Sequence, residues 1–235
     1  MLQLTRSEIW KDIWTRKGQH KEAPLHHANG YDLLSWTEWE ALVAEVCRPI
    51  GLTGKDNILD CGCGAGAFLK VLSDRHPGLK FTGLDYSPSL VERARERLQG
   101  DFLVADITDL RFLDSARFDH TISFGTMMYL GSEEAVVRAL EGMVRVTKPG
   151  GMIYIGEVSD LAKRAQAESI RVSSHQGVKK LSTATADHLY LPKDLFEDVA
   201  RTHQMDVTVV DHSTLNLGSY QAARYRYSVY FRKSP

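Results

Sequence analysis

The stretch NILDCGCGAGAFL, residues 57–69, decides the fold of this chain. A short apolar run ends in Asp60, and cysteines and glycines then alternate: Cys61, Gly62, Cys63, Gly64 and, after one alanine, Gly66. Glycines at the end of a strand let the backbone turn sharply and approach a ligand closely. A glycine-rich turn alone is weak evidence, so a cofactor cradle, a metal or redox site and a plain tight turn all remain open at this point.

The segments around this turn alternate between two patterns. Short apolar runs predict strands at Ile58–Asp60, Lys80–Asp85, Phe102–Asp106, Phe118–Phe124 and Met152–Val158. Helices are expected between most of them: Ala67–Arg75, a helix with Ser87 as its N-cap and Pro88 at its first position that runs to Leu98, and a helix capped by Ser132. Strand and helix in alternation predict a mostly parallel sheet with helices on both faces.

The two ends of the chain differ from this core. Residues 1–50 contain all four tryptophans and predict helices over about 6–17 and 35–48, which we expect to fold over the core as a lid. Residues 160–186 show no clear strand, and a helix from Pro192 is followed by a strand, MDVTVV. The closing RYRYSVYFR, residues 224–232, alternates with period two and predicts a half-buried, antiparallel last strand. We expect a single domain, 1–235, with a lid (1–50), a core (55–158) and a substrate-side segment with the last two strands (159–235).

Acidic residues end the first three predicted strands. Asp85 comes about 20 residues after the glycines, where a carboxylate can accept hydrogen bonds from both hydroxyls of a ribose. Asp106 could accept a hydrogen bond from the exocyclic amine of an adenine, while the backbone N–H of Ile107 donates to a ring nitrogen. Each acid could instead be a helix cap or a solvated strand end. Together with Asp60, they predict an adenosine site at one edge of the sheet.

The chain resembles class I, Rossmann-like S-adenosylmethionine-dependent methyltransferases. The motifs that carry the resemblance cover about residues 56–158 and are ILDCGCGAGAFL, GLDYSPSLVERARERL, FLVADITDL, FDHTISFGTMMYL and MVRVTKPGGMIYIGEV. The resemblance implies a doubly wound, seven-stranded sheet whose last strand is antiparallel and inserted between the fifth and sixth. It also implies S-adenosyl-L-methionine as cofactor, S-adenosyl-L-homocysteine as product, and transfer of a methyl group by in-line displacement.

The resemblance also assigns roles to individual residues. Gly62 and Gly64 would cradle the methionine part, Tyr86 would stack near the adenine, and Phe124 and Gly125 would lie against the cofactor. The full expected cofactor set is Asp60, Gly62, Cys63, Gly64, Asp85, Tyr86, Ser87, Asp106, Ile107, Phe124 and Gly125.

Two rival interpretations of the turn fit less well. Dinucleotide-binding enzymes favour G-x-G-x-x-G, whereas this chain has G-x-G-x-G followed by Ala67 and Phe68. Cys61 and Cys63 have no second Cys or His pair at zinc spacing, and Cys63 falls where the methyltransferase motif often has a cysteine. We therefore expect buried, inert thiols and no metal.

Composition limits the partners. The hydrophobic fraction of 43% is typical of globular proteins. The formal net charge of -1 predicts no general attraction to nucleic acid or to an anionic membrane. Three cysteines give no disulfide framework, so a cytoplasmic protein is expected. The oligomeric state is left open.

The acceptor side is less defined. The run SFGTMMYL lacks the Asn/Asp-Pro-Pro-aromatic motif typical of base-modifying amino-methyltransferases, so we expect an oxygen or nitrogen nucleophile on a small molecule such as a sugar, an amino acid-derived or a secondary metabolite. Candidate catalytic residues are His188, Tyr129 and Glu157, and candidate substrate-side residues are His27, Tyr31, Met128 and Tyr190. A protein or RNA methyltransferase and a non-catalytic cofactor-binding module remain as alternatives. A long basic groove would support the first of these, but the sequence shows none, and we interpret Lys179-Lys180 and Arg224/Arg226 as solvated faces.

Overall fold

The computed structural model of the protein describes residues 5–174, 187–218 and 220–235. One sheet of seven strands has the order β3-β2-β1-β4-β5-β7-β6. Its strands are β1 (Asn57–Cys61), β2 (Lys80–Asp85), β3 (Asp101–Val104), β4 (Phe118–Phe124), β5 (Thr147–Ser159), β6 (Asp206–Asp211) and β7 (Arg226–Arg232). The strands β1 to β5 pair in parallel, and β7 pairs antiparallel with both β5 and β6. The expected topology, with the last strand inserted between the fifth and sixth, is confirmed.

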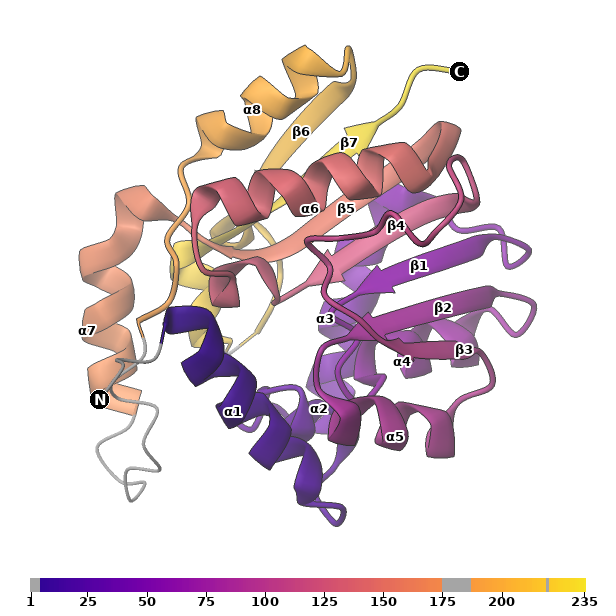
Figure 1. Ribbon diagram of the computed structural model, residues 1–235. Coiled ribbons are helices and arrows are strands. Elements are labelled where there is room, and N and C mark those ends of the chain that lie inside the picture. Colours follow the sequence, from indigo (N-terminus) through magenta and orange to yellow (C-terminus); the bar gives the residue numbers. More distant parts are fainter. Residues whose placement is uncertain (1–4, 175–186, 219) are drawn as a thin grey trace.

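The helices surround this sheet (Figure 1). They are α1 (Arg6–Gln19), α2 (Leu25–Ala28), α3 (Trp36–Cys47), α4 (Ala67–Arg75), α5 (Pro88–Arg97), α6 (Glu133–Val146), α7 (Arg164–Ser174) and α8 (Lys193–Thr202). Their starts follow from the local sequence. Ser87 and Ser132 cap α5 and α6 as predicted, and α1 and α3 each begin with a capping box, Thr5 with Glu8 and Ser35 with Glu38.

The helices form two layers, and each layer packs onto one face of the sheet through its own hydrophobic core. On one face, α6 and α8 pack their apolar sides onto the sheet through residues such as Leu140, Met143 and Phe196. On the other face, α3, α4 and α5 do the same through Trp39, Leu69 and other buried residues. Burial on both faces accounts for the continuous apolar runs in the parallel strands.

The last strand differs from the prediction of a half-buried strand. Every residue of β7 from Arg226 to Phe231 is buried, because β7 lies inside the sheet between β5 and β6 and is covered on both faces. Its polar residues are buried with partners: Arg226 contacts Glu157, and the Ser228 hydroxyl lies 2.7 Å from Nε2 of His212. The period-two pattern therefore separates an apolar buried face from a polar buried face, and Arg226 is not part of a solvated surface.

The helix α1 lies beside the carboxyl ends of the parallel strands, whereas α3 packs on a face of the sheet and β6 and β7 belong to the sheet itself (Figure 1). The helix α1 packs against α5, and the indole nitrogen of Trp10 donates to the carbonyl of Asp187, 3.4 Å away. The amide of Leu189 donates to the carbonyl of Met128 over 2.8 Å. Within the stretch 160–186, residues 164–174 form α7, and residues 175–186 lie outside the described part of the chain.

No helix among the described residues is both long and apolar enough to cross a bilayer.

Candidate functional site

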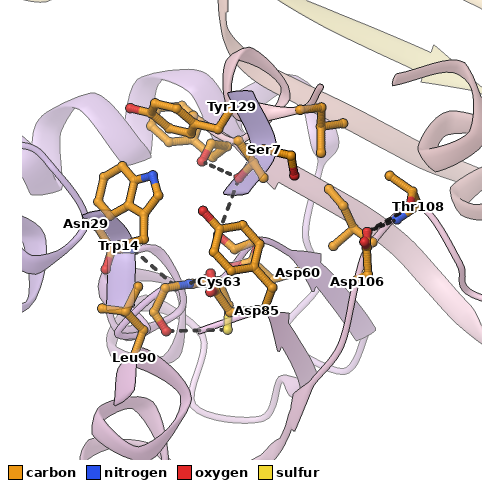
Figure 2. Close-up of a pocket in the computed structure, with 18 of the residues that line it drawn as sticks. Ser7, Trp14, Asn29, Asp60, Cys63, Asp85, Leu90, Asp106, Thr108 and Tyr129 are labelled. Carbon is orange, nitrogen blue, oxygen red and sulfur yellow. Dashed lines mark hydrogen bonds between the residues drawn. The ribbon is translucent and has the colours of Figure 1, made fainter. Parts of the chain in front are cut away.

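A pocket lies beyond the carboxyl ends of β1, β2 and β4, where the strand order reverses (Figure 2). This position is the expected ligand site of an open parallel sheet. Its walls include most of the residues predicted to bind a cofactor: Asp60, Gly62, Cys63, Gly64, Asp85, Tyr86, Asp106, Ile107, Phe124 and Gly125. The remaining walls come largely from α1, the α2–α3 loop and the start of α6.

The glycine-rich turn forms the floor of the pocket. The amides of Gly62 and Cys63 both donate to the carbonyl of Leu84, over 2.7 and 2.9 Å, and so fold the turn back onto the end of β2. Gly64 has φ +56°, and a Cβ placed on it would lie 2.6 Å from Oδ1 of Asn29. Only glycine leaves room for this close contact in that conformation.

The side chain of Asn29 forms two hydrogen bonds with the backbone of the glycine-rich turn. Its side-chain amide donates to the carbonyl of Cys63 over 3.1 Å, and its Oδ1 accepts from the amide of Ala65 over 2.8 Å. These two bonds join a loop of the N-terminal segment directly to the predicted cradle. Asn29 was not predicted as a site residue; the local indication in the sequence is the Asn29-Gly30 pair, a common turn signal.

Asp85 lies at the end of β2 and is buried. Its two carboxylate oxygens accept hydrogen bonds from the amides of Gly64 (2.9 Å) and Ser87 (2.8 Å). Burial raises the pKa of Asp85 to about 6, against the opposing effect of these two amides. The carboxylate is therefore held rigidly, and each oxygen keeps a lone pair for a ligand. Ser87 itself is fully buried as the cap of α5 and does not line the pocket.

Asp60 is buried at the base of the pocket, close to Asp85 in Figure 2. Neither of its carboxylate oxygens has a hydrogen-bond partner among the described residues. Burial, together with the nearby charge of Asp85, raises the pKa of Asp60 to about 8. An unpartnered carboxyl group that lines a cavity is the kind of group that a cationic ligand would satisfy.

The far wall carries the predicted adenine-binding residues. Asp106 is exposed, and its Oδ1 accepts from both the amide and the hydroxyl of Thr108, over 2.9 and 2.8 Å (Figure 2). Ile107 is buried beside it. The hydroxyl of Tyr86 is buried without a hydrogen-bond partner among the described residues, and burial raises its pKa far above the ordinary value.

Aromatic side chains form the wall on the α1 side. The ring of Tyr129 lies 4.5 Å from that of Trp10 and 5.1 Å from that of Trp14. Tyr31 packs 4.3 Å from Trp39, and its hydroxyl would be 2.5 Å from a Cβ on Gly125. Trp14 and Thr126, which also line the pocket, were not predicted; Trp14 could have been inferred from the clustering of tryptophans in residues 1–50.

The structure separates the other predicted catalytic and substrate-side residues. Tyr31 and Tyr129 line the pocket. His188 lies behind Tyr129, with ring centroids 5.3 Å apart, and Glu157 is fully buried in an ion-pair network. Met128 is buried beside Arg226, Tyr190 packs with Tyr225 and Ala167, and His27 packs against His26. None of these five residues is among those that line the pocket.

The cysteines of the turn are buried, and burial raises the pKa of both thiols well above the ordinary value, with a further contribution from Asp60. Both thiols are therefore protonated and poor nucleophiles at neutral pH. Within the part of the chain that the structure describes, no three His, Cys, Asp or Glu residues are grouped as a metal site would require.

A family profile described as a methyltransferase domain matches residues 58–151. Among curated proteins, the chain is 37% identical over 117 residues to the probable tRNA methyltransferase 9B of Mus musculus, covering 49% of this chain and 25% of the relative. It is 33% identical over 122 residues to a demethylmenaquinone methyltransferase of Renibacterium salmoninarum, covering 52% and 48%. The chain thus spans between a quarter and half of the length of these relatives.

Solved structures match the fold over nearly the whole chain. The N-methyltransferase NodS of Bradyrhizobium japonicum, in complex with S-adenosyl-L-homocysteine, aligns with a TM-score of 0.62 at 18% identity, over 94% of this chain and 98% of that one. A chain from the Haloferax volcanii complex with the Trm112 methyltransferase activator aligns with a TM-score of 0.67 at 20% identity, over 96% and 98%. The fold is that of Rossmann-like methyltransferases.

Proposed function

We propose that this chain, whose residues 58–151 match a methyltransferase domain, transfers a methyl group from S-adenosylmethionine to an oxygen or nitrogen nucleophile of a small molecule. The observation that carries this proposal is the pocket itself. Asp60, Asp85 and Asp106 line one cavity at the carboxyl edge of the sheet, and α1 contributes Ser7 and Trp14 to its wall. A cavity lined in this way suits a small acceptor better than a macromolecular one.

The residues present fit the cofactor. The carboxylate of Asp60 would face the ammonium group of the methionine part, since it is buried without a partner. The Gly62 and Gly64 backbone would lie beneath that part, Asp85 would accept from the ribose hydroxyls, and Asp106 with Ile107 would meet the adenine. Asp85 supports this role because two amides already hold its carboxylate in place.

Bound S-adenosylmethionine supplies an electrophilic methyl carbon on a positively charged sulfur. The protein's own contribution is to orient the acceptor in line with that carbon and to exclude water. Trp14, Tyr31 and Tyr129 line the pocket and give it faces that favour a positive charge. Burial and the charge of Glu157 raise the pKa of Tyr31 well above 10, so its hydroxyl stays a hydrogen-bond donor.

The base stays a proposal. We propose His188 as the group that takes a proton from the acceptor; its ring lies behind that of Tyr129, which lines the pocket, and His188 itself is not among the lining residues. Residues 1–50 are proposed to act as the lid, because α1 and Asn29 contact the pocket from outside the sheet. Tyr190, Met128 and His27 are not among the residues that line the pocket, so a role for them toward the acceptor remains a prediction from the sequence. A cytoplasmic location likewise remains a prediction.

A second candidate function is methylation of RNA. It is favoured by the similarity to the probable tRNA methyltransferase 9B over about half of this chain. The net charge of -1 supplies no general attraction to a phosphate backbone, so we place this candidate second.

One experiment separates the two candidates. The protein is incubated with methyl-labelled S-adenosylmethionine and, in parallel, with a small-metabolite extract and with total tRNA. We expect the label in the metabolite fraction that remains after the protein has been removed. Label confined to tRNA would replace the small-molecule proposal with the second candidate, and label in neither would favour a non-catalytic cofactor-binding module.

Loss of the Asn29 clamp should weaken cofactor binding. We expect Asn29→Ala to lower the affinity for S-adenosylhomocysteine about tenfold, because two hydrogen bonds that hold the Cys63–Ala65 backbone are lost. Calorimetric titration measures this change. The matched control is Asn216→Ala at an exposed position, which should bind as the natural protein does. Equal affinity of the two variants would show that Asn29 does not support the cradle.

A further inference from the structure

A buried network of charged and polar side chains lies directly behind the Gly125 wall of the pocket. Its centre is Glu157 on β5, whose side chain is completely buried. Arg226 and Tyr220 both donate to Oε2 of Glu157, and the guanidinium of Arg226 also donates to the Tyr220 hydroxyl over 2.9 Å. Nδ1 of His212 lies 3.0 Å from Oε1, a close electrostatic contact.

The backbone at Glu157 has an unusual conformation that goes with this network. Glu157 has φ +62°, a conformation that residues with a side chain rarely adopt, and the β5–β7 pairing shifts register between Ile155 and Val158. Such an uncommon conformation persists only where the surroundings impose it, and it is frequent next to functional sites. The bulge places the carboxylate within reach of Arg226 instead of leaving it at the strand end.

The same bulge connects the network to the pocket. The amide of Gly125 donates to the carbonyl of Gly156 over 3.0 Å, and a Cβ on Gly125 would lie 3.9 Å from Cβ of Glu157 and 2.5 Å from the Tyr31 hydroxyl. Tyr220 also packs near Tyr31, with ring centroids 6.4 Å apart. The charges of Glu157 and Arg226 therefore sit one residue layer behind the wall against which the cofactor is expected to lie.

The charge balance of this network matters for a cationic ligand. Arg226 cannot lose its proton under ordinary conditions, and it is buried, so its positive charge is poorly screened by water. The attraction of Arg226, with the side-chain contacts of His212 and Tyr220, outweighs burial and holds the pKa of Glu157 at about 2. The pair is thus neutral as a whole at neutral pH.

We propose that Glu157 is a positioning residue that cancels the charge of Arg226 behind Gly125, so that the pocket accepts a positively charged sulfonium. This inference rests on the proposed function, which places the cofactor against Gly125. Arg226 in turn holds the bulge and Met128, whose sulfur lies 3.9 Å from the guanidinium. Glu157 acts here through Arg226 and the pocket wall, and takes no proton from the acceptor.

Two ligands that differ in one charge give a specific test. S-adenosylmethionine carries a positive sulfonium, and S-adenosylhomocysteine has a neutral sulfur in its place. Glu157→Gln keeps the shape of the side chain and leaves Arg226 without its counter-charge. We expect the affinity for S-adenosylmethionine to fall about tenfold more than that for S-adenosylhomocysteine, the size expected for a buried charge roughly 10 Å away.

Three further variants complete the design. Glu157→Gln/Arg226→Met removes both charges and should restore the natural affinity ratio, and Arg226→Lys keeps both charges and should also preserve it. Thr121→Val breaks the buried 2.9 Å contact with the Thr147 hydroxyl, away from the pocket, and serves as the control for lost stability. Each variant is titrated with both ligands by calorimetry, and its folding is checked by thermal melting.

The outcomes separate this inference from the proposed function. Equal weakening of both ligands in Glu157→Gln, or a ratio that the double variant does not restore, would overturn the charge-cancelling role while leaving the cofactor assignment intact. Failure of the natural protein to bind either ligand would instead overturn the proposed function. If Glu157→Gln does not fold, Glu157→Gln/Arg226→Lys is compared with Glu157→Gln/Arg226→Met instead. The variant that keeps the lysine charge must then show the lower affinity for S-adenosylmethionine relative to S-adenosylhomocysteine.

Discussion

Replacing Asp85 by alanine should lower the affinity for S-adenosylhomocysteine about a hundredfold, because hydrogen bonds from two ribose hydroxyls to a buried carboxylate are lost together. The carboxylate also accepts from the amides of Gly64 and Ser87, so the variant loosens the cradle as well. Calorimetric titration with S-adenosylhomocysteine measures the change, and a thermal melt without ligand shows how much of it comes from altered folding.

Two variants make this prediction specific. Asp85→Asn keeps the shape and should lose about tenfold, since a neutral amide oxygen accepts more weakly than a carboxylate. Asp114→Ala, at an exposed position, is the control and should bind as the natural protein does. If Asp85→Ala binds with unchanged affinity, the assignment of Asp85 to the ribose is wrong.

Binding of the cofactor near neutral pH should release about one proton from Asp60. Burial and Asp85 raise the pKa of Asp60 from 3.8 to about 8, so its carboxyl group is protonated in the free protein at pH 7. Pairing with the ligand's ammonium favours the anion, and the proton must leave. Affinity should therefore rise with pH up to about pH 8 and level off above it.

The measurement is calorimetric titration at about pH 7 in buffers of different ionisation enthalpy, with Asp60→Asn as the matched variant. That variant should bind more weakly, release no proton and lose the rise with pH. The free energy of unfolding gives an independent check, because its dependence on pH should be opposite to that of the affinity. The folded state retains a proton that the unfolded chain loses above about pH 4, so the free energy of unfolding from this group falls as pH rises from there to about 8. A natural protein that binds without releasing a proton would show that Asp60 does not face the ammonium.

Much of the fold could be predicted from the sequence because its signals are local. The predicted strand Lys80–Asp85 and helix Ala67–Arg75 have the observed bounds, and Ser87 caps α5 as expected. The inserted antiparallel strand followed from the resemblance rather than from periodicity. Burial of β7 could not be predicted from its own pattern, because partners for its polar face, such as Glu157, lie far away in the sequence.

The site was predictable where its residues follow strand ends. Asp60, Asp85 and Asp106 line the pocket because parallel strands bring their carboxyl ends to one edge. Asn29 was missed because its role depends on contacts with Cys63 and Ala65, more than 30 residues away in sequence. The pairing of Glu157 with Arg226 was likewise invisible, since an arginine in an alternating strand is typical of a solvated face.

The proposed function requires that this chain binds S-adenosylmethionine at the turn after β1. Calorimetric titration of the intact protein with S-adenosylhomocysteine tests it most directly. We expect one site per chain, lost together with ligand-dependent thermal stabilisation in Asp85→Ala but retained in Asp114→Ala. Absence of both binding heat and thermal stabilisation in the natural protein would contradict it.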